Sequence, residues 1–240
     1  MCQTESQKMY DSLTPGYRNY SQSRLLYLNA VDSVVRQYLT PESSVIDFGS
    51  GDGVRVHNIA KNITSKLCLV ENSCNMITKI KDQYPRAWIL NQDFADVNFQ
   101  TGKKYDIAIC LWNVLGHLGN EQRVLTGLTN IRKTVRKNGI VILDINNRHN
   151  ISQYKIKAVK NIIKDVFTYK FANGDIKFNI STNGQNIPSY VHIFNKHEIE
   201  KLIDAAGFEI KSGVYINYAN GDIEKSPLFG QLCYVLTVKK

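Results

Sequence analysis

The chain has 240 residues, of which 43% are hydrophobic, enough to bury a substantial core. No apolar run is long enough to span a bilayer, and the first residues lack the basic and apolar regions of a signal peptide, so no membrane association is expected. The net charge of +9 would suit a nucleic acid or an anionic substrate. Ten of the 30 lysines and arginines cluster between Arg132 and Lys170. We interpret them as solvated faces of two helices, with a basic docking surface as the alternative.

The five cysteines show no metal-ligand spacing, and their odd number argues against a disulfide framework. Cys68, Cys110 and Cys233 lie in apolar, strand-like runs, where cysteine usually behaves as a small buried hydrophobe. A reducing cytoplasm is therefore the expected location.

In chain order, residues 1–20 are polar and tyrosine-rich, with a turn predicted at residues 14–16. Apolar residues then recur at steps of three and four, which predicts a helix over residues 21–39, and Pro41 ends it. A short run of β-forming residues over residues 44–49 is followed by a glycine-rich stretch. Strand and helix patterns alternate after it. Strands are predicted at residues 67–71, 88–91, 105–111 and 139–145, and helices at residues 54–61, 74–83 and 122–137. This alternation favours a parallel sheet covered on both faces.

The pattern changes after Asn150. A helix over residues 151–165 is followed by a hairpin over residues 166–180 that turns at Asn173-Gly174, because Asn-Gly between alternating apolar residues is a strong hairpin signal. A polar loop is predicted over residues 182–188, then a strand over 190–194, a helix over 196–206 and strands over 208–216 and 232–238. We therefore expect one domain with four segments: a lid and helix (residues 1–40), a core (41–149), an inserted cap (150–194) and a last helix with strands (195–240).

The most informative stretch is the glycine-rich turn at residues 47–53, which follows a strand and opens a helix. Glycines allow the backbone to approach a ligand closely. A dinucleotide fingerprint of the form G-x-G-x-x-G would need glycine at position 54, where Val54 stands. The turn instead reads D-x-G-x-G-x-G. Its leading Asp47 can approach an ammonium group on a ligand.

Two acidic residues at the ends of the following strands support the same site. Glu71 lies about 20 residues beyond the turn, the spacing at which a carboxylate reaches the hydroxyls of a ribose. Asp93 follows the third strand, where it can receive an adenine amino group while Phe94 covers the ring. The alternative for Asp93 is a helix cap.

These stretches resemble motifs of class I S-adenosylmethionine-dependent methyltransferases. The first motif of that family is similar to VIDFGSGDG, the end of its second motif to LCLVE, and its adenine-side motif to NQDF. YDIAIC, VRKNGIVILD and the late AGF also match, with Asn138 in place of the usual proline or glycine. The resemblance covers nearly the whole chain from Tyr10. It implies a Rossmann-like, doubly wound, seven-stranded and mostly parallel sheet with an antiparallel last strand, an N-terminal helical lid and a β-hairpin insertion. It also implies that S-adenosylmethionine is bound by Tyr17, Arg24, Asp47, Gly49, Ser50, Gly51, Gly53, Glu71, Asn72, Met76, Asp93, Phe94, Leu111 and Asn113.

The loop after the fourth strand, residues 111–118, bears on the methyl acceptor. It lacks the N-P-P-Y run of amide and base methyltransferases and the cysteine of a covalent pyrimidine mechanism, and it resembles the N-x-L-G-H stretch of small-molecule N- and O-methyltransferases. His117 is the candidate general base, because imidazole titrates near neutral pH. Packing near the cofactor is its alternative role.

The N-terminal segment from Tyr10 to Tyr17 resembles the lid of the same small-molecule subgroup, so Tyr10 is expected at the acceptor. Arg24 is the expected partner of the methionine carboxylate. Arg148, after the fifth strand, is expected to meet an acidic group of the acceptor. Both arginines could equally be ordinary helix residues.

We therefore expect methyl transfer to a small molecule, at nitrogen more than at oxygen. Methylation of tRNA or another nucleic acid is an alternative, and a non-catalytic subunit that binds S-adenosylmethionine is another. The sequence does not indicate an oligomeric state.

Overall fold

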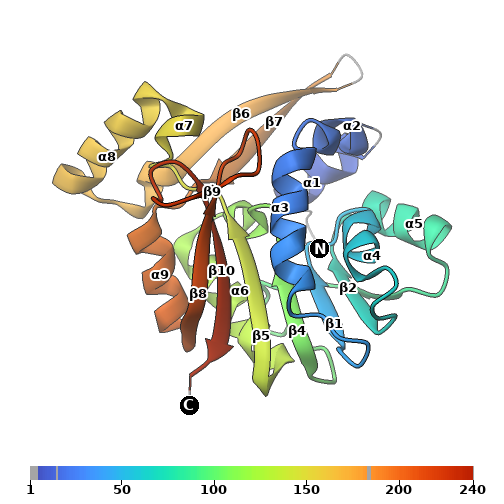
Figure 1. Cartoon of the computed structure of the whole chain (residues 1–240). Helices are drawn as coiled ribbons and strands as arrows, with labels where there is room; N and C mark the ends of the chain where they lie inside the picture. Colours follow the sequence, from blue (N-terminus) through green and yellow to red (C-terminus); the bar gives the residue numbers. More distant parts are fainter. Residues whose placement is uncertain (1–4, 15, 183–184, 240) are drawn as a thin grey trace.

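The computed structural model describes residues 5–14, 16–182 and 185–239 (Figure 1). Its centre is an eight-stranded sheet of order β3-β2-β1-β4-β5-β10-β8-β9. The first five strands in this order pair in parallel, and β10 runs antiparallel between β5 and β8. The strands are β1 (Val45–Phe48), β2 (Leu67–Glu71), β3 (Trp88–Asn91), β4 (Tyr105–Cys110), β5 (Val135–Ile145), β8 (Phe208–Ile216), β9 (Ile223–Glu224) and β10 (Gln231–Val238).

This arrangement confirms the predicted Rossmann-like sheet with its antiparallel last strand. The two-residue β9 adds an eighth strand at the edge, paired antiparallel with the end of β8. Because β1 lies between β2 and β4, Asp47 at its end sits opposite Leu69 and Ile109 in the middle of the parallel strands. The strand order runs outward from β1 in both directions, to β2 and β3 on one side and to β4 and β5 on the other. Open α/β sheets place their ligands at such a reversal of strand order.

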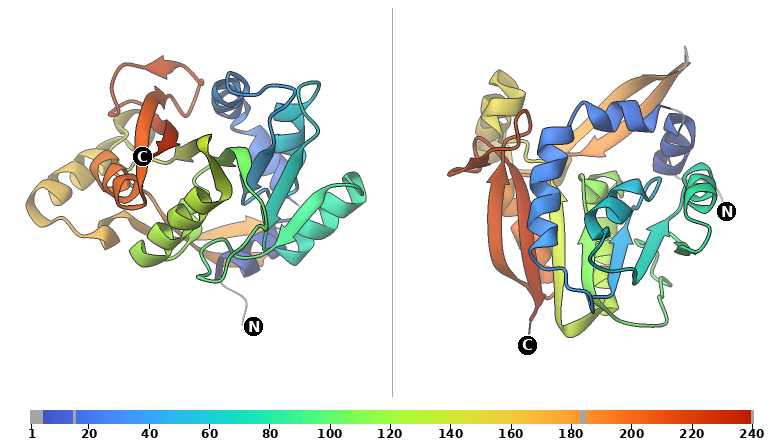
Figure 2. Two further views of the ribbon diagram at one scale, coloured as in Figure 1. Left: turned by 90° about the horizontal axis from the view of Figure 1, so that it is seen from below. Right: turned by 45° about the vertical axis from the view of Figure 1, so that its right-hand side comes forward.

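Helices α3, α4, α5, α6 and α9 pack in two layers on opposite faces of the sheet (Figure 2). Buried side chains of α6 and α9 pack with one set of strand residues, and those of α3, α4 and α5 pack with the other set. Ile46 and Val45 belong to different sets, so β1 is buried on both faces. The helices are α1 (Glu5–Leu13), α2 (Tyr17–Gln22), α3 (Leu25–Arg36), α4 (Val54–Ala60), α5 (Cys74–Gln83), α6 (Glu121–Thr134), α7 (Ile151–Tyr154), α8 (Ile156–Thr168) and α9 (Lys196–Ala205).

Two of the predicted helices are each divided in the structure. The helix expected over residues 21–39 is interrupted after Gln22, and α3 begins at Leu25. The helix expected over residues 151–165 breaks at Lys155, whose φ of +52° lies in the left-handed region that a side chain disfavours. Apolar periodicity continues across the break at Lys155, so the sequence pattern does not reveal it, whereas residues 21–24 are polar and the apolar stripe begins only at Leu25.

The hairpin exists, but its predicted turn is wrong. Residues Phe171–Gly174 form the 3₁₀ helix η2, and the hairpin consists of β6 (Asp175–Thr182) and β7 (Gln185–His192). Residues 185–188, predicted as loop, are therefore strand; residues 183–184 lie outside the described part. Gly174 is at the base of the hairpin, where a Cβ would lie 2.4 Å from the Ile193 carbonyl oxygen. Glycine at this position therefore allows the two backbone segments to approach each other closely.

The N-terminal helices and the hairpin extend over the same end of the sheet (Figure 1). Helix α1 is attached to the start of α5, where the Ser73 hydroxyl donates a hydrogen bond to Asp11 Oδ1 at 2.5 Å. The Lys79 ammonium donates to the Thr14 carbonyl. Helix α2 is attached to the glycine turn by an ion pair between Arg18 and Asp52. These contacts hold α1 and α2 over the carboxyl ends of the parallel strands.

The basic residues between Arg132 and Lys170 lie on several different elements. Arg132 and Lys133 end α6, Lys157 and Lys160 are exposed on α8, and Arg148 is buried. Cys68, Cys110 and Cys233 are buried and free, as their apolar surroundings predicted. No helix in the described ranges combines the length and the apolar character needed to cross a membrane.

Candidate cofactor and acceptor site

The glycine turn joins β1 to α4 through three left-handed residues. Gly49, Gly51 and Gly53 have φ values of +73°, +58° and +75°. A Cβ at Gly49 would lie 2.6 Å from Val114 Cγ1, and one at Gly51 would lie 3.0 Å from the Tyr17 hydroxyl. Both the backbone angles and the close neighbours therefore require glycine in this turn.

Glu71 connects the glycine turn to the end of β2. Its Oε2 accepts a hydrogen bond from the Gly51 amide at 2.8 Å. Its Oε1 accepts from the amides of Asn72 and Ser73 at 2.9 and 2.8 Å. Burial raises the pKa of Glu71, and the three backbone amides lower it in part. The carboxylate is fixed in orientation and borders the cavity.

Asp47 is the penultimate residue of β1 and is 6% exposed. Burial raises its pKa to about 7, and the guanidinium of Arg55 offsets only part of this effect. A buried carboxylate that is costly to ionise is stabilised by a cationic ligand. Asp47 is therefore suited to receive an ammonium group.

At the adenine side, Asp93 is already engaged by protein groups. Its Oδ2 accepts a hydrogen bond from Arg123 at 2.6 Å, and its Oδ1 accepts from the Ala95 amide at 2.9 Å. Each oxygen retains a further lone pair, so an amino group can still be accepted. Phe94 packs edge-on against Phe48, with ring centroids 5.2 Å apart.

These residues border a cavity of about 620 Å³ at the carboxyl ends of the parallel strands. It extends beneath α1 and α2. The structure brings twelve of the residues predicted from the sequence to this cavity: Tyr10, Tyr17, Asp47, Gly49, Ser50, Gly51, Glu71, Asn72, Asp93, Phe94, Leu111 and His117.

Four other predicted cofactor residues do not border the cavity. Gly53 faces Ile80 and Leu69 in the core, each 3.3 Å from the position of a Cβ. Met76 is a buried residue of α5. The remaining two are Asn113, which forms hydrogen bonds with backbone groups, and Arg24, which stacks on an aromatic ring.

Asn113 donates a side-chain hydrogen bond to the His192 carbonyl at 3.1 Å and accepts one from the Asn146 amide at 3.1 Å. It therefore fastens the loop after β4 to the hairpin. The guanidinium of Arg24 lies over the ring of Tyr218, 4.9 Å from its centroid. Arg24 is thus turned away from the position that the sequence suggested for it.

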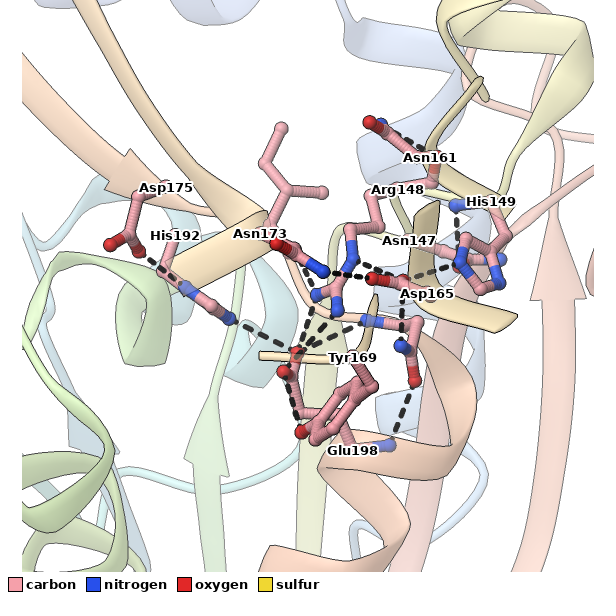
Figure 3. Close-up of polar contacts among 12 residues, drawn as sticks. Asn147, Arg148, His149, Asn161, Asp165, Tyr169, Asn173, Asp175, His192 and Glu198 are labelled. Carbon is pink, nitrogen blue, oxygen red and sulfur yellow. Dashed lines mark hydrogen bonds and ion pairs between the residues drawn. The ribbon is translucent and has the colours of Figure 1, made fainter. Parts of the chain in front are cut away.

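Arg148 also lies outside the cavity, and this corrects the expectation that it meets an acceptor. Its guanidinium is 1% exposed and forms ion pairs with Asp165 at 2.7 Å and Glu198 at 2.6 Å (Figure 3). His192 bridges Glu198 and Asp175. This buried cluster joins β5, α8, α9 and the hairpin. All charge on Arg148 is consequently matched by protein carboxylates.

His117 ends the 3₁₀ helix η1 (Val114–His117) and faces the cavity. Its Nδ1 lies 3.2 Å from the carbonyl oxygen of Tyr190 on β7. A carbonyl can only accept a hydrogen bond, so Nδ1 carries the hydrogen and Nε2 keeps its lone pair. Burial lowers the pKa of His117 to about 4, against a smaller opposite effect of the Tyr190 carbonyl. The imidazole is therefore neutral near pH 7.

Aromatic rings surround this end of the cavity. Tyr10 packs edge-on against His117 at a centroid separation of 5.5 Å and against Tyr17 at 6.5 Å. Tyr17 in turn lies 6.0 Å from Trp112. All four side chains border the cavity, so its wall at this end is aromatic.

Sequence reasoning missed several residues of the cavity. Trp112 lies in the loop after β4, where no sequence motif gives it a role. Tyr190 lies in a predicted strand that carries no functional motif. Arg55 falls within the helix predicted over residues 54–61, and its partner Asp32 lies 23 positions away.

The polar groups of the site fit S-adenosylmethionine. Its three amide partners leave Glu71 a further lone pair for a ribose hydroxyl, while Asp93 can accept the adenine amino group and Asp47 the ammonium of the amino-acid end. The buried guanidinium of Arg55 presents two nitrogens that find no hydrogen-bond acceptor within the described residues. Among those residues, no three histidine, cysteine, aspartate or glutamate side chains gather to hold a metal ion.

The comparisons with known proteins agree with this geometry. A family model described as a methyltransferase domain matches residues 22–212, and the chain therefore belongs to this family of S-adenosylmethionine-dependent methyltransferases. No curated protein sequence matches the chain.

Solved structures of the same fold include an S-adenosylmethionine-dependent methyltransferase from Clostridium acetobutylicum, at 14% identity and a TM-score of 0.63 over 90% of this chain and 92% of that one. The sugar N-methyltransferase KedS8 from Streptoalloteichus is 13% identical, with a TM-score of 0.62 over 93% and 91%. CalS10, an amino pentose methyltransferase from Micromonospora echinaspora, is 15% identical, with a TM-score of 0.60 over 93% and 96%.

Proposed function

We propose that this methyltransferase acts on a small molecule and that the accepting atom is a nitrogen. The cofactor supplies an electrophilic methyl group on a sulfonium, and the remaining task of the protein is to orient and desolvate the nucleophile. The observation that carries the choice of nitrogen is the state of His117, which is neutral and has a pKa lowered to about 4 by burial.

A hydroxyl acceptor loses its proton as the new bond forms, so it needs a base with a pKa near the working pH. An imidazole with a pKa of about 4 provides little driving force for that transfer. A neutral amine keeps its protons until after methyl transfer and needs only a hydrogen-bond acceptor that aims its lone pair. Nε2 of His117 meets this requirement, because the Tyr190 carbonyl fixes the other ring nitrogen as the donor.

The size and cover of the cavity support a small acceptor. Its 620 Å³ falls within the range of about 300–1,000 Å³ typical of small-ligand sites, and cofactor and acceptor must share it. Helices α1 and α2 and the hairpin residue Tyr190 border it, which supports a cap of N-terminal helices and hairpin that excludes water. Two structural neighbours are named as a sugar N-methyltransferase and an amino pentose methyltransferase, which agrees with an amine acceptor. Four free cysteines agree with the reducing cytoplasm as its location.

The test is methyl uptake from labelled S-adenosylmethionine by matched panels of amino sugars, amino acids, sugars and phenols. We expect methylation of amines alone. The rate should rise with pH as the acceptor amine loses its proton. His117→Leu should lower kcat by up to about tenfold, because one hydrogen bond that orients the acceptor contributes about 0.5–1.5 kcal/mol. Methylation of hydroxyl acceptors alone would refute the assignment of nitrogen.

Nucleic-acid methylation is the second candidate, because Lys157, Lys160 and Lys164 are exposed on α8. Neutralising several phosphates makes binding steeply dependent on salt, with losses of about 10³-fold or more between 50 and 200 mM salt. An acceptor KM that stays constant over this range would exclude it.

A further inference from the structure

Arg55 is distinguished among the cations of the cavity by its unused donors. Its Nε donates to Asp32 Oδ1 at 2.8 Å. Its Nη2 lies at the same distance from that oxygen as an ion pair, but its N–H bonds are not aimed at it. Among the described residues, neither Nη1 nor Nη2 has a hydrogen-bond acceptor, although both are buried. A buried donor without an acceptor is costly, so this arrangement indicates a missing partner.

The other arginines that border the cavity are occupied. Arg18 pairs with Asp52 and also donates to Gln83. Arg36 donates to the Asn58 carbonyl, and Arg123 pairs with Asp93 at 2.6 Å. Arg24, which the sequence suggested, lies over the Tyr218 ring outside the cavity. Among the described arginines that border the cavity, Arg55 is therefore the one whose unpaired donors are buried.

The surroundings of Arg55 define which ligand group it can receive. Asp32 on α3 holds the guanidinium from one side and is itself buried. The charge of Arg55 also acts on Asp47, at the end of β1, and on Asp144, at the end of β5. The guanidinium thus lies near the ends of the central strands, on the same side as the carboxylate suited to an ammonium group.

An ammonium acceptor and a guanidinium with two free donors, both bordering one cavity, match the two charges of a free amino acid. We propose that Arg55 binds the carboxylate at the amino-acid end of S-adenosylmethionine, while Asp47 receives its ammonium. The planar fork of arginine offers parallel N–H groups to a carboxylate, and Asp32 fixes its orientation before the ligand arrives. The site then selects ligands that carry an intact amino-acid end.

The inference depends on the cofactor of the family and not on the amine acceptor proposed above. It is tested by calorimetric titration with S-adenosylhomocysteine and with its decarboxylated analogue, which keeps the ammonium but lacks the carboxylate. No methyl transfer is required, so failure to methylate amines leaves this result unaffected.

The wild-type protein should bind S-adenosylhomocysteine about 10- to 100-fold more tightly than the analogue, the range of charge-assisted hydrogen bonds. Arg55→Met should bind both ligands alike, at the affinity that the wild type has for the analogue. Arg55→Lys keeps the charge without the fork and should give an intermediate preference. Arg24→Met is the matched control and should retain the full preference.

Equal loss of affinity for both ligands in Arg55→Met would show a purely structural role and overturn the proposal. If the preference for S-adenosylhomocysteine over the analogue survives in Arg55→Met but disappears in Arg24→Met, the residue that binds the carboxylate is Arg24 and the proposal is wrong. If Arg55→Met does not fold, as judged by circular dichroism, Arg55→Lys and the wild-type preference still decide. A wild type that binds both ligands equally refutes the proposal without any variant.

Discussion

Cofactor affinity should depend on pH through Asp47. Its pKa is raised to about 7 by burial, so below pH 7 the free protein holds this carboxyl mostly protonated and without charge. An ammonium ligand favours the ionised form, and binding must therefore release a proton in acidic solution. Between pH 6 and pH 7.5 the ionised fraction rises from roughly a tenth to three quarters, which predicts about eightfold tighter binding, or about 1.2 kcal/mol.

The assay is calorimetric titration with S-adenosylhomocysteine from pH 5.5 to 7.5 in buffers of different ionisation enthalpy. The buffer dependence of the heat counts the protons released. Glu71 is also buried with a raised pKa, so the matched variant Asp47→Asn is needed to assign the effect. This variant should bind weakly at every pH and show a flat profile. An affinity independent of pH in the wild type, or an unchanged slope in Asp47→Asn, would refute the reasoning.

The same residue should limit the stability of the free protein. An acid whose folded pKa is raised contributes stability that is complete below its unfolded pKa and is lost as pH rises through the folded value of about 7. In the absence of ligand, Asp47→Asn should therefore increase the free energy of unfolding at pH 8 by a few kcal/mol, measured by urea denaturation. Gly49→Ala should lower the free energy of unfolding by roughly 1–3 kcal/mol and weaken S-adenosylhomocysteine binding, because φ is +73° and the new Cβ would clash with Val114. Arg148→Met should cost about 3–5 kcal/mol by leaving two buried carboxylates unpaired, with cofactor affinity changed far less than stability. Burial raises the pKa of Asp165, but hydrogen bonds from Arg148, Asn195 and Asn173 outweigh it and hold this pKa below its usual range. This part of the stability should therefore be lost in acid, and the loss should be smaller in Arg148→Met.

The cofactor half of the site was predictable because its residues follow one another at strand ends. Asp47, Glu71 and Asp93 each end or follow a parallel strand, and the topology of such a sheet brings these ends together. Spacing along the chain is therefore nearly equivalent to position in space. The glycine turn was predictable for the same reason, since three left-handed residues need glycine wherever they occur.

The arginines were not predictable, because their roles depend on partners that are distant in sequence. Arg148 finds Glu198 50 positions away, and Arg55 finds Asp32 23 positions away. Nothing in the local pattern distinguishes a guanidinium that is already paired from one with free donors. The prediction of the hairpin turn was wrong for a different reason. The chain contains Asn-Gly at residues 173–174 and again at residues 183–184, and turn chemistry alone does not choose between them.

The buried cluster around Arg148 has a consequence for how such an enzyme could change its acceptor. The main chain of β7 orients His117 through Tyr190 and holds Asn113 through His192, so the acceptor side of the site is built on the hairpin. The cofactor side is built on the turns after β1, β2 and β3. The cap could therefore be exchanged between relatives without altering the cofactor turns, but not as residues 150–194 alone. The transferable unit must include Arg148 and Glu198, because a foreign cap without these partners would leave charges unmatched inside the protein.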